Sequence, residues 1–267
     1  MQARFDFGDL GELSFDIPEA ETSLPSSFFF GVKKGGSTLL ASIVRSISPF
    51  SPLDLLELPR LVFSKGLPLY RCVRDVDRVL NRPGYAFGTF RWLPENWLID
   101  LHAPVKRRYL WLVRDPRDML VSLYYSDAKS HAIPGSGPLR ERMLHQRNVA
   151  SGLSIDDYVM DRGPLMLRNY YRTMQLDTVG ATVLRYEDVI YSKQELVRAV
   201  AEFLDVDASD RLIAQIAADH DVIPEGERPS EHIRRAHPGD HENKLKPSTI
   251  EYLTDLFRLV LVRFGYI

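Results

Sequence analysis

The feature that most constrains the fold is an apolar run that ends in a loop of lysines and glycines. The segment reads Phe28-Phe29-Phe30-Gly31-Val32-Lys33-Lys34-Gly35-Gly36-Ser37-Thr38, and apolar residues then recur at helical spacing at positions 39, 40, 43, 44 and 47. Glycine-rich backbone and a helix N-terminus favour anions, and lysines add full positive charge. The stretch predicts a strand, a phosphate-binding loop and a helix, with Ser37 and Thr38 placed to cap the helix or to hydrogen-bond the anion.

The order of residues in this loop differs from that of a nucleoside-triphosphate loop. A Walker A loop has its lysine directly after the last glycine. Here Lys33 and Lys34 precede Gly35 and Gly36, and Ser37 follows. The simplest alternative is a tight strand–helix turn with two solvated lysines, and a second anion-binding element is needed to decide between the two.

The composition predicts one globular α/β domain over residues 1–267, with 45% hydrophobic and 26% charged side chains. The net charge of −2 argues against a general nucleic-acid-binding protein. The single cysteine, Cys72, excludes an intramolecular disulfide and is expected to be a buried thiol. We see neither a secretory signal nor a run of about 18 apolar residues, so we expect a cytoplasmic protein without a membrane span.

Two further strand–helix patterns favour a three-layer α/β/α domain with a mostly parallel sheet. Residues 109–113 form a continuous apolar run, typical of a buried parallel strand, and Asp115-Pro116 then suits the start of a helix. Residues 181–186 predict a third strand. Helices are expected at 155–174 with a break near Gly163-Pro164, at 192–204, at 209–218 and at 250–264.

Three segments have no clear period and are expected to be irregular. Residues 1–26 are interpreted as a lead-in to the first strand. Residues 64–105 form a long insert rich in aromatic residues, and residues 126–150 resemble a mobile loop or lid. Such inserts often form part of a binding cleft, although a plain surface excursion fits the composition equally well.

Cationic side chains occur in two later loops as well. Arg114 ends the strand at 109–113, where open α/β sheets bind ligands, and Arg234-Arg235 lie within the polar segment 219–246. Arginine suits bidentate phosphate recognition. Each site also has a simpler interpretation, a surface ion pair for Arg114 and a solvated charge pair for Arg234-Arg235, but their order along the chain favours joint anion binding.

With these motifs together, the sequence resembles the sulfotransferases that use 3′-phosphoadenosine 5′-phosphosulfate (PAPS). Lys34-Gly35-Gly36-Ser37-Thr38 is similar to the 5′-phosphosulfate loop of that family. Arg114-Asp115-Pro116-Arg117-Asp118 with Ser122 is similar to its 3′-phosphate signature. Tyr186-Glu187-Asp188 resembles a segment whose tyrosine lies near the nucleotide, and Arg234-Arg235-Ala236 resembles a late loop that closes over the 3′-phosphate.

The resemblance implies roles for these residues. Lys34 would neutralise the departing 5′-phosphate, and the loop from Lys33 to Thr38 would hold it. The 3′-phosphate would be bound by Arg114, Ser122 and Arg234 or Arg235, with Tyr186 near the nucleotide. PAPS would be the co-substrate, and no metal would be required because cationic side chains neutralise the charge.

The general base is the point at which the sequence departs from the family pattern. The cytosolic branch has Lys-Thr-His upstream of the arginine strand, whereas Gly88-Thr89-Phe90 stands at that place here. The carbohydrate-modifying branch uses a glutamate soon after the first helix, and Glu57 is the nearest candidate. His237 is the second candidate and His102 the third.

The predicted function is sulfuryl transfer to a hydroxyl group of a sugar, phenol, lipid or carrier-bound acceptor. One alternative is a P-loop kinase or NTPase, which needs a lysine directly after the loop glycines and an acid for Mg²⁺. Another is a non-catalytic relative that binds adenosine 3′,5′-bisphosphate (PAP). Nothing in the sequence indicates an oligomeric state.

Overall fold

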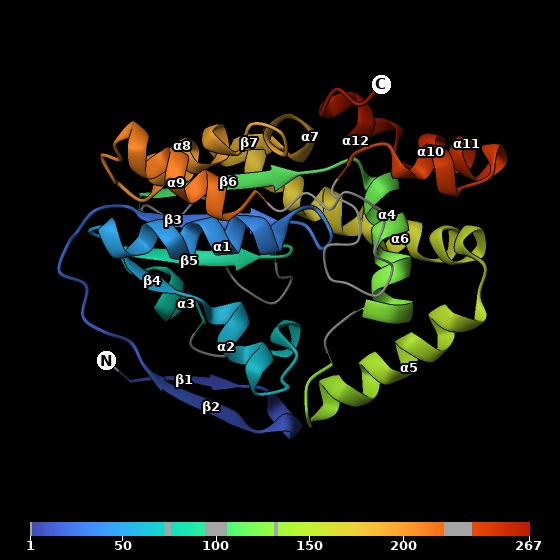
Figure 1. Cartoon of the computed structure of the whole chain (residues 1–267). Helices are drawn as coiled ribbons and strands as arrows, with labels where there is room; N and C mark the ends of the chain where they lie inside the picture. The colour runs from blue at the N-terminus through green and yellow to red at the C-terminus, as the bar shows by residue number, and fades with distance from the viewer. Residues whose placement is uncertain (1, 73–75, 94–105, 131–132, 222–236) are drawn as a thin grey trace.

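A five-stranded parallel sheet forms the centre of the chain, in the order β4-β5-β3-β6-β7 (Figure 1). The computed structural model describes residues 2–72, 76–93, 106–130, 133–221 and 237–267. The strands are β3 Ser26–Gly31, β4 Asp54–Leu56, β5 Tyr85–Phe90, β6 Arg107–Val113 and β7 Thr182–Arg185. The sheet confirms the predicted α/β class with parallel strands.

Helices cover both faces of the sheet, as a three-layer α/β/α domain requires (Figure 1). Successive side chains of β3 enter different cores, because Phe28 and Phe30 belong to one hydrophobic cluster and Phe29 belongs to the other. The face of Phe29 is covered by α1 Ser37–Ile47, α8 Lys193–Phe203 and α9 Asp210–Asp219. The opposite cluster includes α2 Leu58–Ser64, α3 Val76–Leu80, α4 Pro116–Tyr125, α6 Ile155–Thr173, α11 Pro247–Leu256 and α12 Arg258–Arg263. The remaining helices are α5 Pro138–Gly152, α7 Tyr186–Val189 and α10 Asp240–Lys244.

The strand order brings the two predicted anion-binding loops together. β3 and β6 are neighbours in parallel register, with Gly31 opposite Leu112. From β3 the chain passes to β4 and β5 on one side of the sheet and then crosses to β6 and β7 on the other, so β3 and β6 flank the topological switch point. Open α/β sheets bind ligands at this position, beyond the carboxyl ends of the strands.

Two segments that the sequence left irregular contain strands. The lead-in holds an antiparallel hairpin of β1 Gln2–Asp6 and β2 Glu12–Asp16, whose inward side chains include the fully buried Phe5. The insert at 64–105 contains β5, which pairs with both β3 and β4. These two expectations were wrong because the strands are short and a glycine, Gly88, interrupts the side-chain alternation of β5.

Two expectations about helices also need correction. Residues 126–150 are largely helical, because a π-helical turn at Ser126–Ser130 is followed by α5. Helix α6 is continuous through Gly163-Pro164 instead of breaking there. Pro164 is on the exposed side, whereas Gly163 packs so closely on α11 that a Cβ at this position would lie 2.8 Å from Leu256 Cδ2. None of the described helices has the length and hydrophobicity needed to span a bilayer.

Candidate functional site

The lysine–glycine loop makes a sharp turn between β3 and α1. Lys34 and Gly36 both adopt left-handed backbone conformations, with φ of 71° and 89°. The amide of Gly35 donates to the Val32 carbonyl at 2.7 Å, so Gly35 closes the turn. The first amides of α1 have no acceptor within the helix itself. Ser37 is buried and Thr38 is exposed at this helix start.

Three elements meet at the ring of Tyr186, which follows β7. The guanidinium carbon of Arg114 lies 4.4 Å from the centre of this ring. Gly36 approaches the ring so closely that an added Cβ would lie 2.8 Å from Tyr186 Cδ2. The Nη1 atom of Arg114 donates to the Lys34 carbonyl at 3.3 Å. The loops after β3, β6 and β7 therefore form one packed unit, in which Arg114 is buried but its Nε makes no hydrogen bond.

Asp118 links Arg114 to the segment Gly239–His241. Its carboxylate accepts hydrogen bonds from the amides of Gly239 at 2.7 Å and His241 at 3.0 Å, and lies 2.7 Å from His241 Nδ1. Arg114 Nη2 lies 3.7 Å from the same carboxylate. Burial alone would raise the pKa of Asp118, but the His241 hydrogen bonds and the charge of Arg114 outweigh it and lower the pKa to about 2.

Positive charge is concentrated at the loop. Burial, followed by the nearby charges of Lys33, Arg91 and Arg114, lowers the pKa of Lys34 to about 8. Burial also lowers the pKa of Lys33, although Asp127, whose Oδ1 lies 3.3 Å from Lys33 Nζ, acts in the opposite direction. Groups of like charge that are held together in this way bind an anion favourably, since it relieves their mutual repulsion.

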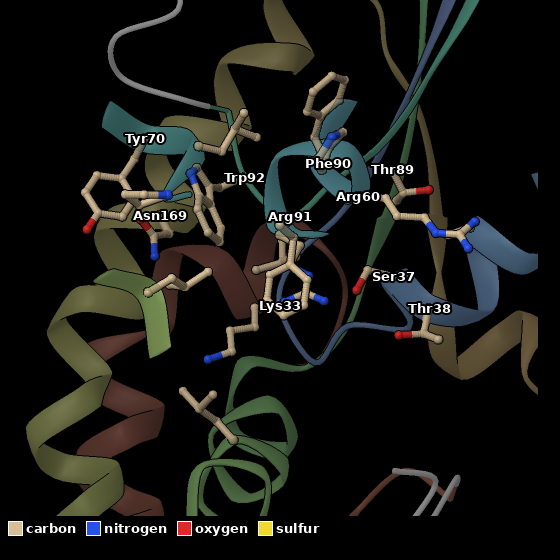
Figure 2. Close-up of a pocket in the computed structure, with 18 of the residues that line it drawn as sticks. Lys33, Ser37, Thr38, Arg60, Tyr70, Thr89, Phe90, Arg91, Trp92 and Asn169 are labelled. Carbon is tan, nitrogen blue, oxygen red and sulfur yellow. The ribbon is translucent and has the colours of Figure 1, made fainter. Parts of the chain in front are cut away.

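A cavity of about 610 Å³ lies beside the loop (Figure 2). The loop contributes Val32, Lys33, Ser37 and Thr38 to its wall, but Arg114 and Tyr186 are not part of the lining. In the view of Figure 2, Lys33 and Arg91 lie between Ser37 and Thr38 on one side and Tyr70 and Asn169 on the other. The cavity therefore lies next to the unit around Tyr186, but Arg114 and Tyr186 do not form part of its wall.

Glu57 lies in the wall of this cavity at the start of α2. Its two carboxylate oxygens are 3.1 Å from Arg45 Nε and 3.0 Å from Arg60 Nη1. The carboxylate is partly exposed, with 21% of its side-chain surface accessible. A carboxylate oxygen that accepts one hydrogen bond still has acceptor capacity for another.

The other predicted residues are distributed around the site. Ser122 follows Asp118 by one helical turn on α4 and is partly buried. His237 stacks on Tyr191, with Nδ1 2.7 Å from the tyrosine hydroxyl, and does not line the cavity. Arg234, Arg235 and His102 lie outside the described residues.

Two residues of the cavity were missed by the sequence interpretation. Asp127 is buried on the π-helical turn after α4, where its carboxylate also accepts a 2.6 Å hydrogen bond from the Tyr158 hydroxyl. Arg91 follows β5 directly. No sequence motif marked Asp127, and the strand β5 that precedes Arg91 had not been recognised. Within the described ranges, no group of three or more His, Cys, Asp or Glu is arranged to hold a metal ion.

The fold and the loops define an α/β protein with cationic loops at the switch point of a parallel sheet. Residues 24–265 match the sequence model of the sulfotransferase domain family. Since this covers most of the chain, the protein belongs to the sulfotransferase family. No curated protein matches the sequence significantly.

Solved structures share the fold at low sequence identity. Mouse sulfotransferase SULT7A1 complexed with PAP is 15% identical, with a TM-score of 0.53 over 89% of this chain and 84% of the other. Retinol dehydratase in complex with androsterone and the inactive cofactor PAP is 15% identical, with a TM-score of 0.50 over 88% and 80% of the two chains. The similarity confirms the fold.

Proposed function

We propose that this chain transfers a sulfuryl group from PAPS to a hydroxyl group of an acceptor held in the adjacent cavity. The observation that carries the proposal is the packed unit of Lys34, Arg114 and Tyr186 directly beside that cavity. Both solved relatives were determined with PAP bound, which is the product that PAPS leaves behind.

The residues of the unit fit a nucleotide with two separate phosphate groups. Gly36 packs so closely on the Tyr186 ring that no side chain could be placed there, which lets the loop backbone lie against the ring, and Arg114 keeps a buried Nε without a hydrogen bond. We assign the 5′-phosphate to Lys33, Lys34 and the start of α1 at Ser37 and Thr38. We assign the 3′-phosphate to Arg114 and Ser122, with Arg234 and Arg235 as further predicted contacts.

Sulfuryl transfer requires the protein mainly to position the reactants and to stabilise charge. PAPS supplies the sulfuryl group, whose sulfur–oxygen bond to the 5′-phosphate breaks as a new bond to the acceptor oxygen forms. Protonated Lys34 would neutralise the phosphate that leaves. Glu57, the carboxylate in the cavity wall, would accept the proton of the acceptor hydroxyl.

A binding measurement followed by a transfer measurement tests the proposal. PAP at 100 times its Kd is expected to stabilise the protein by about 2.7 kcal/mol, whereas ATP with Mg²⁺ is expected to shift the melting temperature little. Stabilisation by ATP-Mg²⁺ alone would favour a kinase or NTPase. Binding of PAP without transfer of labelled sulfate from PAPS to any hydroxyl in a broad acceptor panel would favour a non-catalytic relative.

The assignment of Glu57 as the base has its own test. Glu57→Gln is expected to lower turnover by roughly 10²- to 10⁴-fold and to leave PAP binding unchanged, because the glutamine cannot accept the proton. His237→Ala is expected to retain turnover, since His237 contacts Tyr191 and lies outside the cavity wall. The reverse pattern would make His237 the base. Urea unfolding of Glu57→Gln separates loss of the base from loss of the ion pairs with Arg45 and Arg60.

A further inference from the structure

The cavity beside the loop has an excess of positive charge that a PAPS site does not explain. Among the residues that the structure describes, its wall contains two carboxylates, Glu57 and Asp127, and eight cationic side chains. The cationic residues are Lys33, Arg45, Arg60, Arg91, Arg142, Arg162, Arg168 and Arg172. Only Lys33 belongs to the loop that we assign to the donor.

One face of α6 supplies much of this charge. The residues of α6 in the wall are 162, 165, 166, 168, 169 and 172, which follow helical spacing. They place Arg162, Arg168 and Arg172 along the same side of the cavity. Arg168 is exposed and, within the described part of the chain, makes no hydrogen bond or ion pair. Its charge is therefore available to a ligand.

Arg91 is a partly buried cation of the cavity wall. It lies close enough to Lys33 and Lys34 that its charge lowers the pKa of both. Burial also lowers the pKa of Arg91 itself, and no described carboxylate forms an ion pair with it. A guanidinium held beside two ammonium groups is unfavourable until an anion joins them.

The rest of the wall suits the body of a small molecule. Tyr70 and Trp92 contribute aromatic surface, and Arg142 lies over the Tyr70 ring at 5.0 Å from its centre. Leu165 and Met166 add apolar area. A cavity of about 610 Å³ is within the range of pockets for drug-sized ligands.

We infer that the acceptor is itself an anion: a small hydroxyl compound that carries a phosphate, sulfate or carboxylate group, held by the arginines of α6 together with Arg91. The inference rests on the proposed function, because it names the acceptor class of the same site. Arginine binds all three groups through paired, charge-assisted hydrogen bonds. The cavity wall is therefore expected to prefer anionic over neutral acceptors, whichever of the three groups carries the charge.

The experiment separates the acceptor from the donor by saturating the full chain with PAP first. Two probe series are then titrated by calorimetry. One consists of 4-hydroxyphenylacetamide, 4-hydroxyphenylacetate, 4-hydroxybenzenesulfonate and 4-hydroxybenzylphosphonate; the other consists of glucose, glucuronate, glucose 6-sulfate and glucose 6-phosphate. In at least one series, the anionic members are expected to bind 10-fold or more tightly than the neutral one, since hydrogen bonds to charged groups are stronger than those between neutral groups. The tightest anion identifies the group.

Variants connect the preference to the named residues. Arg168→Gln and Arg91→Gln, singly and together, are expected to reduce the preference for anions to about 3-fold or less. Arg168→Gln, which lies on α6 away from the donor loop, is expected to leave PAP binding intact. Arg211→Gln, at an exposed position on α9, is the matched control and is expected to change nothing. Arg168→Lys is expected to recover part of the preference.

Each outcome has a distinct meaning. If PAP fails to bind, the proposed function fails. If PAP binds but neutral probes bind as tightly as the anions, if no probe binds, or if the arginine variants keep the full preference, the acceptor inference is overturned and the proposed donor remains. Labelled sulfate found on the anionic probe after turnover with PAPS would support both.

Discussion

Replacing Asp118 with asparagine tests the link between Arg114 and the segment Gly239–His241. The carboxylate is almost fully buried, and its environment lowers the pKa from the usual 3.8 to about 2. At 1.36 kcal/mol per unit, the native environment favours the charged form by about 2 kcal/mol. Breaking a buried charge pair by removing one partner costs about 3–5 kcal/mol. We therefore expect Asp118→Asn to lower the free energy of unfolding by about 3 kcal/mol.

Urea unfolding at pH 7 measures this loss, and its pH dependence tests the cause. Because the pKa is lowered in the folded state, the stabilisation is fully present above about pH 4 and is lost as the pH falls through about 2. The difference between the wild type and Asp118→Asn should stay constant from pH 7 to pH 4 and shrink below it. Asp255→Asn is the control, because its ion pair with Arg258 is exposed and should contribute less than about 1 kcal/mol. A loss at Asp118 no larger than that at Asp255 would refute the reasoning.

Three further predictions concern the donor side. PAP affinity should fall as the pH rises through about 8, because Lys34 loses its proton there, and Lys34→Met should remove this pH dependence in calorimetric titrations. Arg114→Lys should weaken PAP binding by 10-fold or more, since an ammonium cannot stack on Tyr186 and donate as a guanidinium does, and unchanged affinity would contradict the 3′-phosphate assignment. Gly36→Ala should destabilise the protein by about 1–3 kcal/mol more than Gly180→Ala in urea unfolding. Both glycines have positive φ, but only at Gly36 would the methyl group meet a neighbouring ring.

The sequence predicted the two cationic loops after β3 and β6 because their signals are local. A continuous apolar run marked β3 and another marked β6, and the cations Lys34 and Arg114 follow these strands directly. Parallel strands that are adjacent in a sheet end at the same edge, so these two local motifs lie close together in the fold.

The strands and helices that were missed have weak local signals. Helix α5 buries only Met143 and Ala150, so its sequence lacks the apolar stripe that predicts a helix. In β5, Gly88 stands where a side chain would otherwise continue the alternation, and the surrounding aromatic residues resemble a loop insert. In both cases tertiary packing, not local propensity, determines the structure.

The cationic cavity could not have been predicted from the sequence. Its arginines come from α1, α2, the end of β5, α5 and α6, and none is adjacent to another along the chain. The net charge of −2 for the whole chain gave no indication of a strongly cationic cavity. The cationic wall forms only when folding brings these separate segments together around the cavity.

The unit of Lys34, Arg114 and Tyr186 and the arginines of the cavity are held by different parts of the fold. This difference affects how such an enzyme can be modified. Lys34, Arg114 and Tyr186 are fixed to the ends of three hydrogen-bonded neighbouring strands, so a change in one disturbs the others. Arg142 and Arg168 are carried on α5 and α6, which contribute no strand to the sheet. Mutagenesis libraries restricted to the cavity face of these two helices should change which acceptor is used. The proposed sulfuryl transfer from PAPS should be retained.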